Sequence, residues 1–147
     1  MNSINKSQCD FKLTGPKYLV EGGTLIVREP TIKDTATYIC KATNEAGSIS
    51  ASFQAKIFQK PKITGESLRT VTAGTSTNIK CIITKGVPAP TISWQFLSDH
   101  ELMFVQLEGS QDELRIPMVS VGHAGRYKCV ANNSIGNAEH VTILNVQ

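Results

Sequence analysis

A pattern of eleven residues that occurs twice constrains this chain more than any other feature of its sequence. Segment 37–47 reads Thr-Tyr-Ile-Cys-Lys-Ala-Thr-Asn-Glu-Ala-Gly, and segment 126–136 reads Arg-Tyr-Lys-Cys-Val-Ala-Asn-Asn-Ser-Ile-Gly. Both copies share Tyr, Cys, Ala, Asn and Gly at the same spacing, 89 residues apart. The first half alternates like a half-buried strand, and Asn and Gly then favour a turn. The repeat predicts two similar structural units.

The composition indicates a folded chain and gives no sign of a nucleic-acid partner. The 147 residues fit two small domains, and 40% hydrophobic with 18% charged residues supports a core. The net charge is +3, with eight Lys/Arg against five Asp/Glu in residues 1–60 and seven of each in 61–147. A surplus this small is typical of a solvated surface, so we expect no nucleic-acid binding.

Membrane and secretion signals are not apparent in the sequence. No apolar run approaches the length that crosses a bilayer, so we expect no membrane insertion of this chain. Residues 1–6 read Met-Asn-Ser-Ile-Asn-Lys, which lacks the apolar segment of a secretory signal peptide.

The sequence predicts no enzyme. The three histidines are scattered, and neither a Gly-x-Ser-x-Gly motif nor a phosphate-binding loop occurs. The cysteines form no close pair of the Cys-x-x-Cys kind that zinc sites use. The acidic pair Asp112-Glu113 adjoins a polar turn and is most simply solvated. We therefore expect no catalytic residue, no metal site and no cofactor.

Short strands predict an all-β fold. Apolar residues alternate in short runs separated by turns about 8 to 12 residues apart, without a helical period, which is typical of an antiparallel sandwich. We expect strands at 17–20, 24–27, 37–42 and 53–57, and then at 63, 68–71, 78–83, 92–96, 103–107, 114–116, 127–131 and 142–146.

The C-terminal unit carries a further set of residues with diagnostic spacing. Trp94 follows Cys81 by thirteen residues, Cys129 comes later, and Tyr127 precedes that cysteine by two. With these residues the chain resembles the immunoglobulin superfamily, in particular its I-set domains. Tandem units of this kind are similar to those of hemicentin-like and contactin-like adhesion or matrix proteins.

The resemblance implies an immunoglobulin-like (I-set) antiparallel β-sandwich, with one complete domain preceded by a truncated one. It implies a disulfide between Cys81 and Cys129, with Trp94 packed against the bridge. It also implies a tyrosine corner at Tyr127, with Tyr38 as its counterpart in the first unit. We expect a truncated domain at 1–58, a short linker at 59–61 and a complete domain at 62–147.

The two units depart from the family in different ways. The family has Asp six residues before the second Cys, where Asp34 stands in the first unit and His123 in the second. We therefore do not expect the family's salt bridge at His123. The first unit lacks a Trp, whether Cys9 aligns with Ser98 or serves as the first cysteine. A half-sandwich leaves an apolar face and strand edges open, which favours association through the first unit.

The remaining cysteines and the sequons bear on the compartment. Cys9 and Cys40 are expected either to pair or to be free thiols, and the sequence leaves both open. The sequons at Asn5 and Asn132 are candidate glycosylation sites. Disulfides and glycans indicate an extracellular, secreted location within a larger protein. The alternative is a cytoplasmic protein similar to titin, in which the same cysteines stay reduced.

Two functions follow from this resemblance. The preferred hypothesis is a non-catalytic adhesion or matrix module that recognises protein partners, homophilic or heterophilic. Its candidate binding surface is the apolar run Met103, Phe104 and Val105 on an expected edge strand. The alternative hypothesis is a structural spacer in an intracellular filament, whose role is extension.

Overall fold

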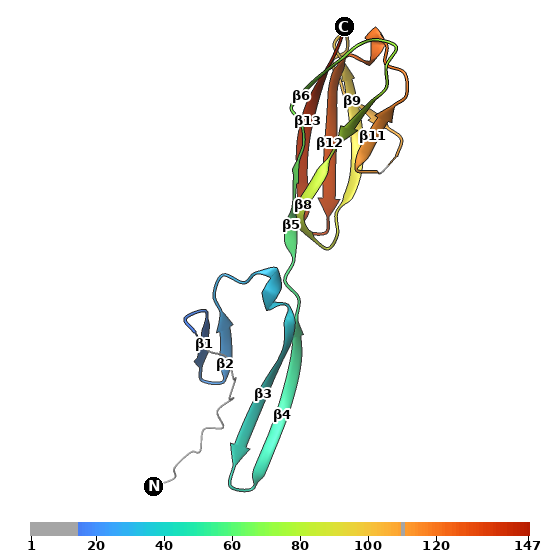
Figure 1. Cartoon of the computed structure of the whole chain (residues 1–147). Helices are drawn as coiled ribbons and strands as arrows, with labels where there is room; N and C mark the ends of the chain where they lie inside the picture. Colours follow the sequence, from blue (N-terminus) through green and yellow to red (C-terminus); the bar gives the residue numbers. More distant parts are fainter. Residues whose placement is uncertain (1–14, 110) are drawn as a thin grey trace. The chain divides into compact units, whose positions relative to one another are not determined.

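The computed structural model describes residues 15–109 and 111–147, and the chain divides into two compact units at residues 1–57 and 58–147 (Figure 1). The described residues form strands joined by turns, with two short 3₁₀ helices and no α-helix. The fold is therefore all-β, as the alternating pattern predicts.

Unit 2 is built on a five-stranded sheet with the order β10-β9-β12-β13-β6. Its strands are β9 (Thr91–Ser98), β12 (Gly125–Asn133), β13 (Gly136–Val146), β10 (Val105–Leu107) and β6 (Leu68–Val71). The central strands are antiparallel, and β6 runs parallel to β13 at one edge. The Asn-Asn-Ser-Ile-Gly half of the repeat forms the turn between β12 and β13.

A second layer faces this sheet and consists of two short ladders. β7 (Thr77–Lys80) pairs with β11 (Glu113–Ile116), and β8 (Ile82–Val87) pairs with β5 (Gln59–Thr64). The single strand expected at 78–83 is thus divided at Cys81 into β7 and β8. These layers complete the antiparallel sandwich.

The core of unit 2 is centred on a disulfide between the two layers. Cys81 and Cys129 are bonded and only 1% exposed. Trp94 is 2% exposed, lies directly opposite Cys129 in the β9–β12 register, and donates its indole N–H to the Gln111 carbonyl at 2.8 Å. The apolar residues packed with them are Ile79, Ile92, Ile116, Val119, Tyr127, Ala131 and Leu144.

Close packing of β9 against β12 requires a glycine at position 125, two residues before Tyr127. Its φ is 149°, and a Cβ at this position would lie 2.3 Å from the Leu97 carbonyl oxygen. A side chain would therefore force β9 and β12 apart where β12 begins. Glycine allows the close approach that aligns Trp94 with Cys129.

Unit 1 contains two antiparallel hairpins in its described part. β1 (Tyr18–Glu21) pairs with β2 (Thr24–Val27), and the 3₁₀ helix η1 (Ile32–Asp34) leads into β3 (Ala36–Asn44), which pairs with β4 (Gly47–Ala55). Within the described residues, β3 has no second strand neighbour, whereas its counterpart β12 pairs with both β9 and β13. The expectation of a truncated domain at 1–58 stays a prediction, because residues 1–14 lie outside the described part.

Residues 59–61 do not form the expected linker. They begin β5, in which Gln59 pairs with Val87 and Pro61 is buried. The prediction was wrong because proline is tolerated in a strand at a sheet edge, where its missing N–H leaves no ladder bond unmade. The strand expected at 103–107 is also shorter, because β10 spans only 105–107.

The Cys81–Cys129 bridge closes a loop with a sequence separation of 48. In the chain-entropy model, opening a loop of this size costs about 4 kcal/mol of stability. We expect the C81A/C129A variant to lose about 4 kcal/mol in the free energy of unfolding, measured by urea titration with Trp94 fluorescence. Reduced wild-type protein is the matched control and should show the same loss. An oxidised wild type no more stable than either would contradict the prediction.

Candidate functional site

The candidate binding surface lies at the β10 edge of the five-stranded sheet. Val105 begins β10 and pairs with Phe96, whereas Met103 and Phe104 belong to the loop that precedes the strand. Leu102 is 98% exposed and Met103 78% exposed, and Val105 is exposed as well. Large apolar side chains that remain this open on a folded unit are typical of interaction surfaces when they are contiguous. We call Leu102, Met103, Phe104 and Val105 the edge patch.

Phe104 is the ordered centre of the edge patch. It is half-buried, and the Lys128 ammonium lies 4.3 Å from the centroid of its ring. Lys128 comes from β12, so its side chain reaches across β9 to the residue just before β10. A cation held over an aromatic face is worth about 0.5–1 kcal/mol at an exposed site. The contact holds the ring in place and adds a positive charge to an apolar surface.

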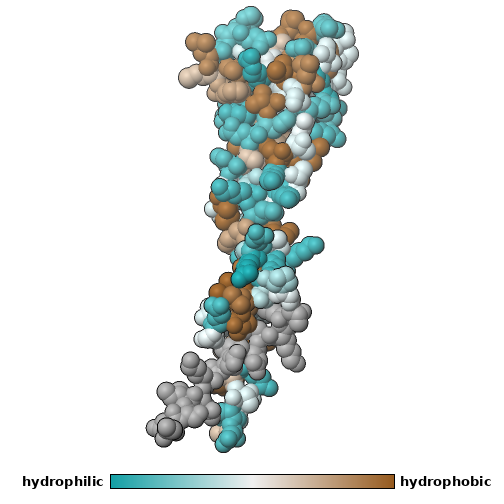
Figure 2. Space-filling view, turned by 90° about the vertical axis from the view of Figure 1, so that its left-hand side faces the viewer, coloured by the Kyte–Doolittle hydropathy of each residue, from teal (hydrophilic) through white to brown (hydrophobic). Residues whose placement is uncertain are grey.

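Other exposed apolar residues lie at the same end of unit 2. Ser98 at the end of β9 pairs with Gly125 at the start of β12, so the loop after β9 and the 3₁₀ helix η2 (Val121–His123) lie at one end of the sheet. Met118 and Val121, at 71% and 76% exposed, belong to this end. Figure 2 shows apolar side chains gathered at the upper end of unit 2, which carries the C-terminus in Figure 1.

Both units contain the expected tyrosine hydroxyl bonds. Tyr127 donates to the His123 carbonyl at 2.9 Å, and Tyr38 donates to the Asp34 carbonyl at 2.8 Å. Burial raises the pKa of Tyr127 to about 12, so this hydroxyl stays protonated and remains a donor at neutral pH. Each bond ties a core strand to the turn before it.

Asp34 is the most strongly perturbed carboxylate in the described part of the chain. It accepts from Lys17 Nζ at 2.5 Å, from the Thr31 amide at 2.6 Å and from the Tyr18 hydroxyl at 3.2 Å. The lysine ammonium, followed by the Thr31 amide, lowers its pKa to about 2. In the first unit Asp34 thus forms a salt bridge with Lys17.

His123 stands at the matching place in unit 2 and makes a neutral version of the same cap. The Ser120 amide donates to His123 Nδ1 at 2.9 Å, and the Ser120 hydroxyl lies at the same distance. His123 is in neither of the two salt bridges of the described residues, which join Lys17 with Asp34 and Arg69 with Glu66. The imidazole therefore keeps the capping hydrogen bond without the ion pair.

The remaining predicted site residues include two that lie outside the described part of the chain. Cys9 and Asn5 lie outside the described residues, so the Cys9–Cys40 pairing and the first sequon stay predictions. Asn132 is exposed on β12. The side chain of this sequon asparagine is therefore at the surface, where a glycan must be attached.

Sequence reasoning did not assign a role to Asn133. Its side-chain amide donates to the carbonyls of Gln59 at 2.8 Å and Pro88 at 3.0 Å, while its oxygen accepts from the amides of Ile135 and Gly136. One side chain thus joins the β12–β13 turn to β5 and to the loop after β8. The only available signal was the asparagine that follows each cysteine by four residues in the repeat.

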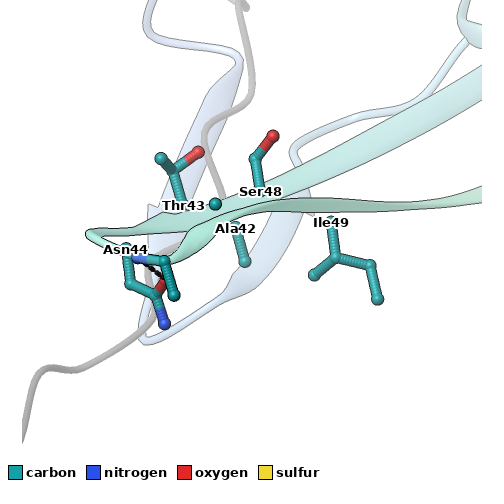
Figure 3. A pocket seen from close by; sticks show the side chains of 7 residues that line it. Ala42, Thr43, Asn44, Ser48 and Ile49 are labelled. Carbon is teal, nitrogen blue, oxygen red and sulfur yellow. Dashed lines mark hydrogen bonds between the residues drawn. The ribbon is translucent and has the colours of Figure 1, made fainter.

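A shallow hollow at the β3–β4 turn, lined by residues 42–44 and 46–49, does not assemble a chemical site. Thr43 and Ser48 point to one side of the hairpin, and Ala42 and Ile49 point to the other (Figure 3). The lining is therefore divided between the two faces of the hairpin (Figure 3), and the Asn44 oxygen is used by the Ala46 amide of its own turn.

The described residues contain neither a cluster of metal ligands nor a membrane-spanning helix. No group of three or more His, Cys, Asp or Glu there is placed to hold a metal ion. No helix among these residues is long and apolar enough to cross a membrane.

Comparisons with known proteins agree with this geometry. A family model described as an immunoglobulin domain matches residues 60–133. Hemicentin-1 of Mus musculus is 29% identical over 133 residues, covering 88% of this chain and 2% of its own length. Neural cell adhesion molecule 1 of Gallus gallus is 30% identical over 136 residues, covering 86% of this chain and 12% of its own. The chain thus spans a small part of these relatives.

Solved structures are similar over both units. A crystal structure of Dscam1 isoform 6.9, comprising its N-terminal four Ig domains, superposes with a TM-score of 0.74 at 25% identity. The match covers 92% of this chain and 33% of that one.

The Asp34 site gives a test by titration. The folded-state pKa of Asp34 is lowered from its ordinary value of 3.8 to about 2. Its charge therefore stabilises unit 1 at every pH above 3.8, and this stabilisation is lost as the pH falls towards about 2. In the Lys17→Met variant we expect the pKa of Asp34 to move towards 3.8, measured by NMR of the carboxyl carbon. An unchanged midpoint in the variant would show that Lys17 does not set this pKa.

Proposed function

Because the chain belongs to the immunoglobulin superfamily, we propose that it is a non-catalytic recognition module of an extracellular adhesion or matrix protein. The single observation that carries this proposal is the edge patch. Leu102 and Met103 stand almost fully exposed beside Phe104, whose ring is held by Lys128. Phenylalanine and methionine, which this surface presents, are among the residues enriched at protein interfaces.

The short β10 strand supports recognition at this edge. It has three residues and pairs with β9 along one side. The short strand limits uncontrolled edge-to-edge pairing, since only a few backbone groups are open. Binding at this edge would therefore depend on the side chains of the edge patch more than on strand addition, which makes it selective.

The extracellular part of the proposal rests on the cysteines and on Asn132. A buried disulfide such as Cys81–Cys129 persists in oxidising compartments. Asn132 is an exposed acceptor in a sequon. Both features favour a secreted module over the intracellular spacer, in which these cysteines would be reduced.

The relatives support adhesion as the function. One of them is by its name a neural cell adhesion molecule. Because the chain spans 12% of that protein and 2% of hemicentin-1, the partners of the whole proteins are carried over only as a proposal.

Unit 1 supplies a second surface for association. Phe53 lies opposite Tyr38, and Ile49 opposite Ala42, on one face of the β3–β4 hairpin. Phe53 is 52% and Ile49 75% exposed on this face. We infer that unit 1 is a shortened sandwich whose open face also takes part in protein contacts.

The adhesion proposal is tested with beads coated with the secreted chain. We expect the beads to aggregate with one another or to attach to cultured cells, and we expect the L102S/M103S variant to lose this adhesion. Both side chains are exposed, so the variant should fold normally.

The matched control is M118S/V121S, which removes two apolar side chains as exposed as Met103 from the same end of unit 2. It should adhere like the wild type. Wild-type beads that neither aggregate nor attach, or an L102S/M103S variant that adheres fully, would contradict the proposal.

A further inference from the structure

Three lysines lie on the β5–β8 ladder. In β5, Lys60 and Lys62 are exposed on either side of the buried Pro61, and the stem of Lys60 passes close to Gly136 at the start of β13. Lys85 of β8 is exposed and pairs directly with Lys62. We call these three residues the lysine cluster.

The spacing of the lysine cluster concentrates positive charge on a small surface. Directly opposed residues on antiparallel strands have Cβ atoms about 5 Å apart. Residues two apart along a strand lie about 7 Å apart. Lys62 thus has a like charge both across the ladder and along the strand, an arrangement that destabilises the free protein. A bound anion would remove this repulsion.

The lysines have no acidic partner in the part of the chain that the structure describes. The salt bridges there are Lys17 with Asp34 and Arg69 with Glu66. On the neighbouring β7–β11 ladder Lys80 lies opposite an acidic residue, Glu113, whereas Lys62 lies opposite another lysine. None of the three lysines of the cluster takes part in either salt bridge.

The charge of unit 2 is segregated and not generally basic. Residues 58–147 contain eight Lys/Arg and seven Asp/Glu, a net charge of +1. Four of the seven acidic residues lie in the connection between β9 and β11, at residues 99, 101, 108 and 112. Local attraction for anions at the lysine cluster thus does not come from the net charge of the unit.

We propose that the lysine cluster binds a linear sulfated polysaccharide. Lysines on an open strand face are mobile point charges without the rigid fork that matches a single carboxylate. They suit a chain that presents several anionic groups in succession. A polysaccharide of this class is met outside the cell, so the choice of polyanion rests on the extracellular location proposed above.

The test measures binding of a fluorescent heparin octasaccharide to the secreted chain by anisotropy. The K62Q/K85Q variant keeps the side-chain stems and removes two charges. We expect it to bind about tenfold more weakly, and the slope of log Kd against log salt to fall by about two. Thermal unfolding should show a midpoint equal to or above that of the wild type, because a like-charge pair is removed.

The matched control is R115Q/R126Q, which removes two exposed cations from β11 and β12. It should bind heparin within about twofold of the wild type, if the charge acts locally. The L102S/M103S variant should also bind normally, so failure of adhesion and failure of heparin binding are separable.

Three results would overturn the proposal. The first is no binding of the octasaccharide by wild-type protein in about 50 mM salt, where such contacts are strong. The second is equal weakening by both double variants, which would indicate a response to net charge alone. The third is binding of poly-glutamate of matched charge as tightly as heparin, which would indicate an acidic protein partner.

Discussion

The bond between Cys81 and Cys129 joins the two layers of unit 2 at the centre of its core, and the rest of that unit is arranged around it. Cys129 lies in the middle of β12, Cys81 lies between β7 and β8, and Trp94 covers the bridge from β9. The bridge fixes β12 against the β7–β8 connection of the facing layer, and Gly125 allows β9 and β12 to approach where β12 begins. The edge patch and the lysine cluster then lie at fixed positions on the outside.

The described part of unit 1 repeats the short-range features of unit 2. It retains the hairpin, the tyrosine hydroxyl bond and the capped turn, all of which involve residues close in sequence. The turn is stabilised electrostatically by Lys17 and Asp34, whereas in unit 2 His123 provides a neutral acceptor. In unit 2, core packing and the Cys81–Cys129 bridge supply much of the stability, and His123 takes part in neither salt bridge of the described residues.

The sequence predicted those features that depend on local pattern. Strand positions follow from alternating residues, and the roles of Cys81, Trp94 and Tyr127 follow from the family resemblance that these residues carry. The linker prediction failed because the Gln-Lys-Pro run looks like a break, although burial of Pro61 places it in a strand.

Contacts between distant segments could not be predicted. Lys62 meets Lys85 only through register shifts in the β5–β8 ladder, and Lys128 reaches Phe104 across an intervening strand. No periodicity in a single sequence encodes such a register shift. The hydrogen bond from Asn133 to the Gln59 carbonyl joins residues 74 positions apart, and it too is not encoded in any local pattern.

A peptide mass map of the secreted, unreduced chain tests most directly whether this is an extracellular module built around a bridged sandwich. The account predicts that Cys81 and Cys129 are found in a linked peptide pair, and that the two peptides separate on reduction. Recovery of both cysteines as free thiols from material that has passed through a secretory host would contradict it.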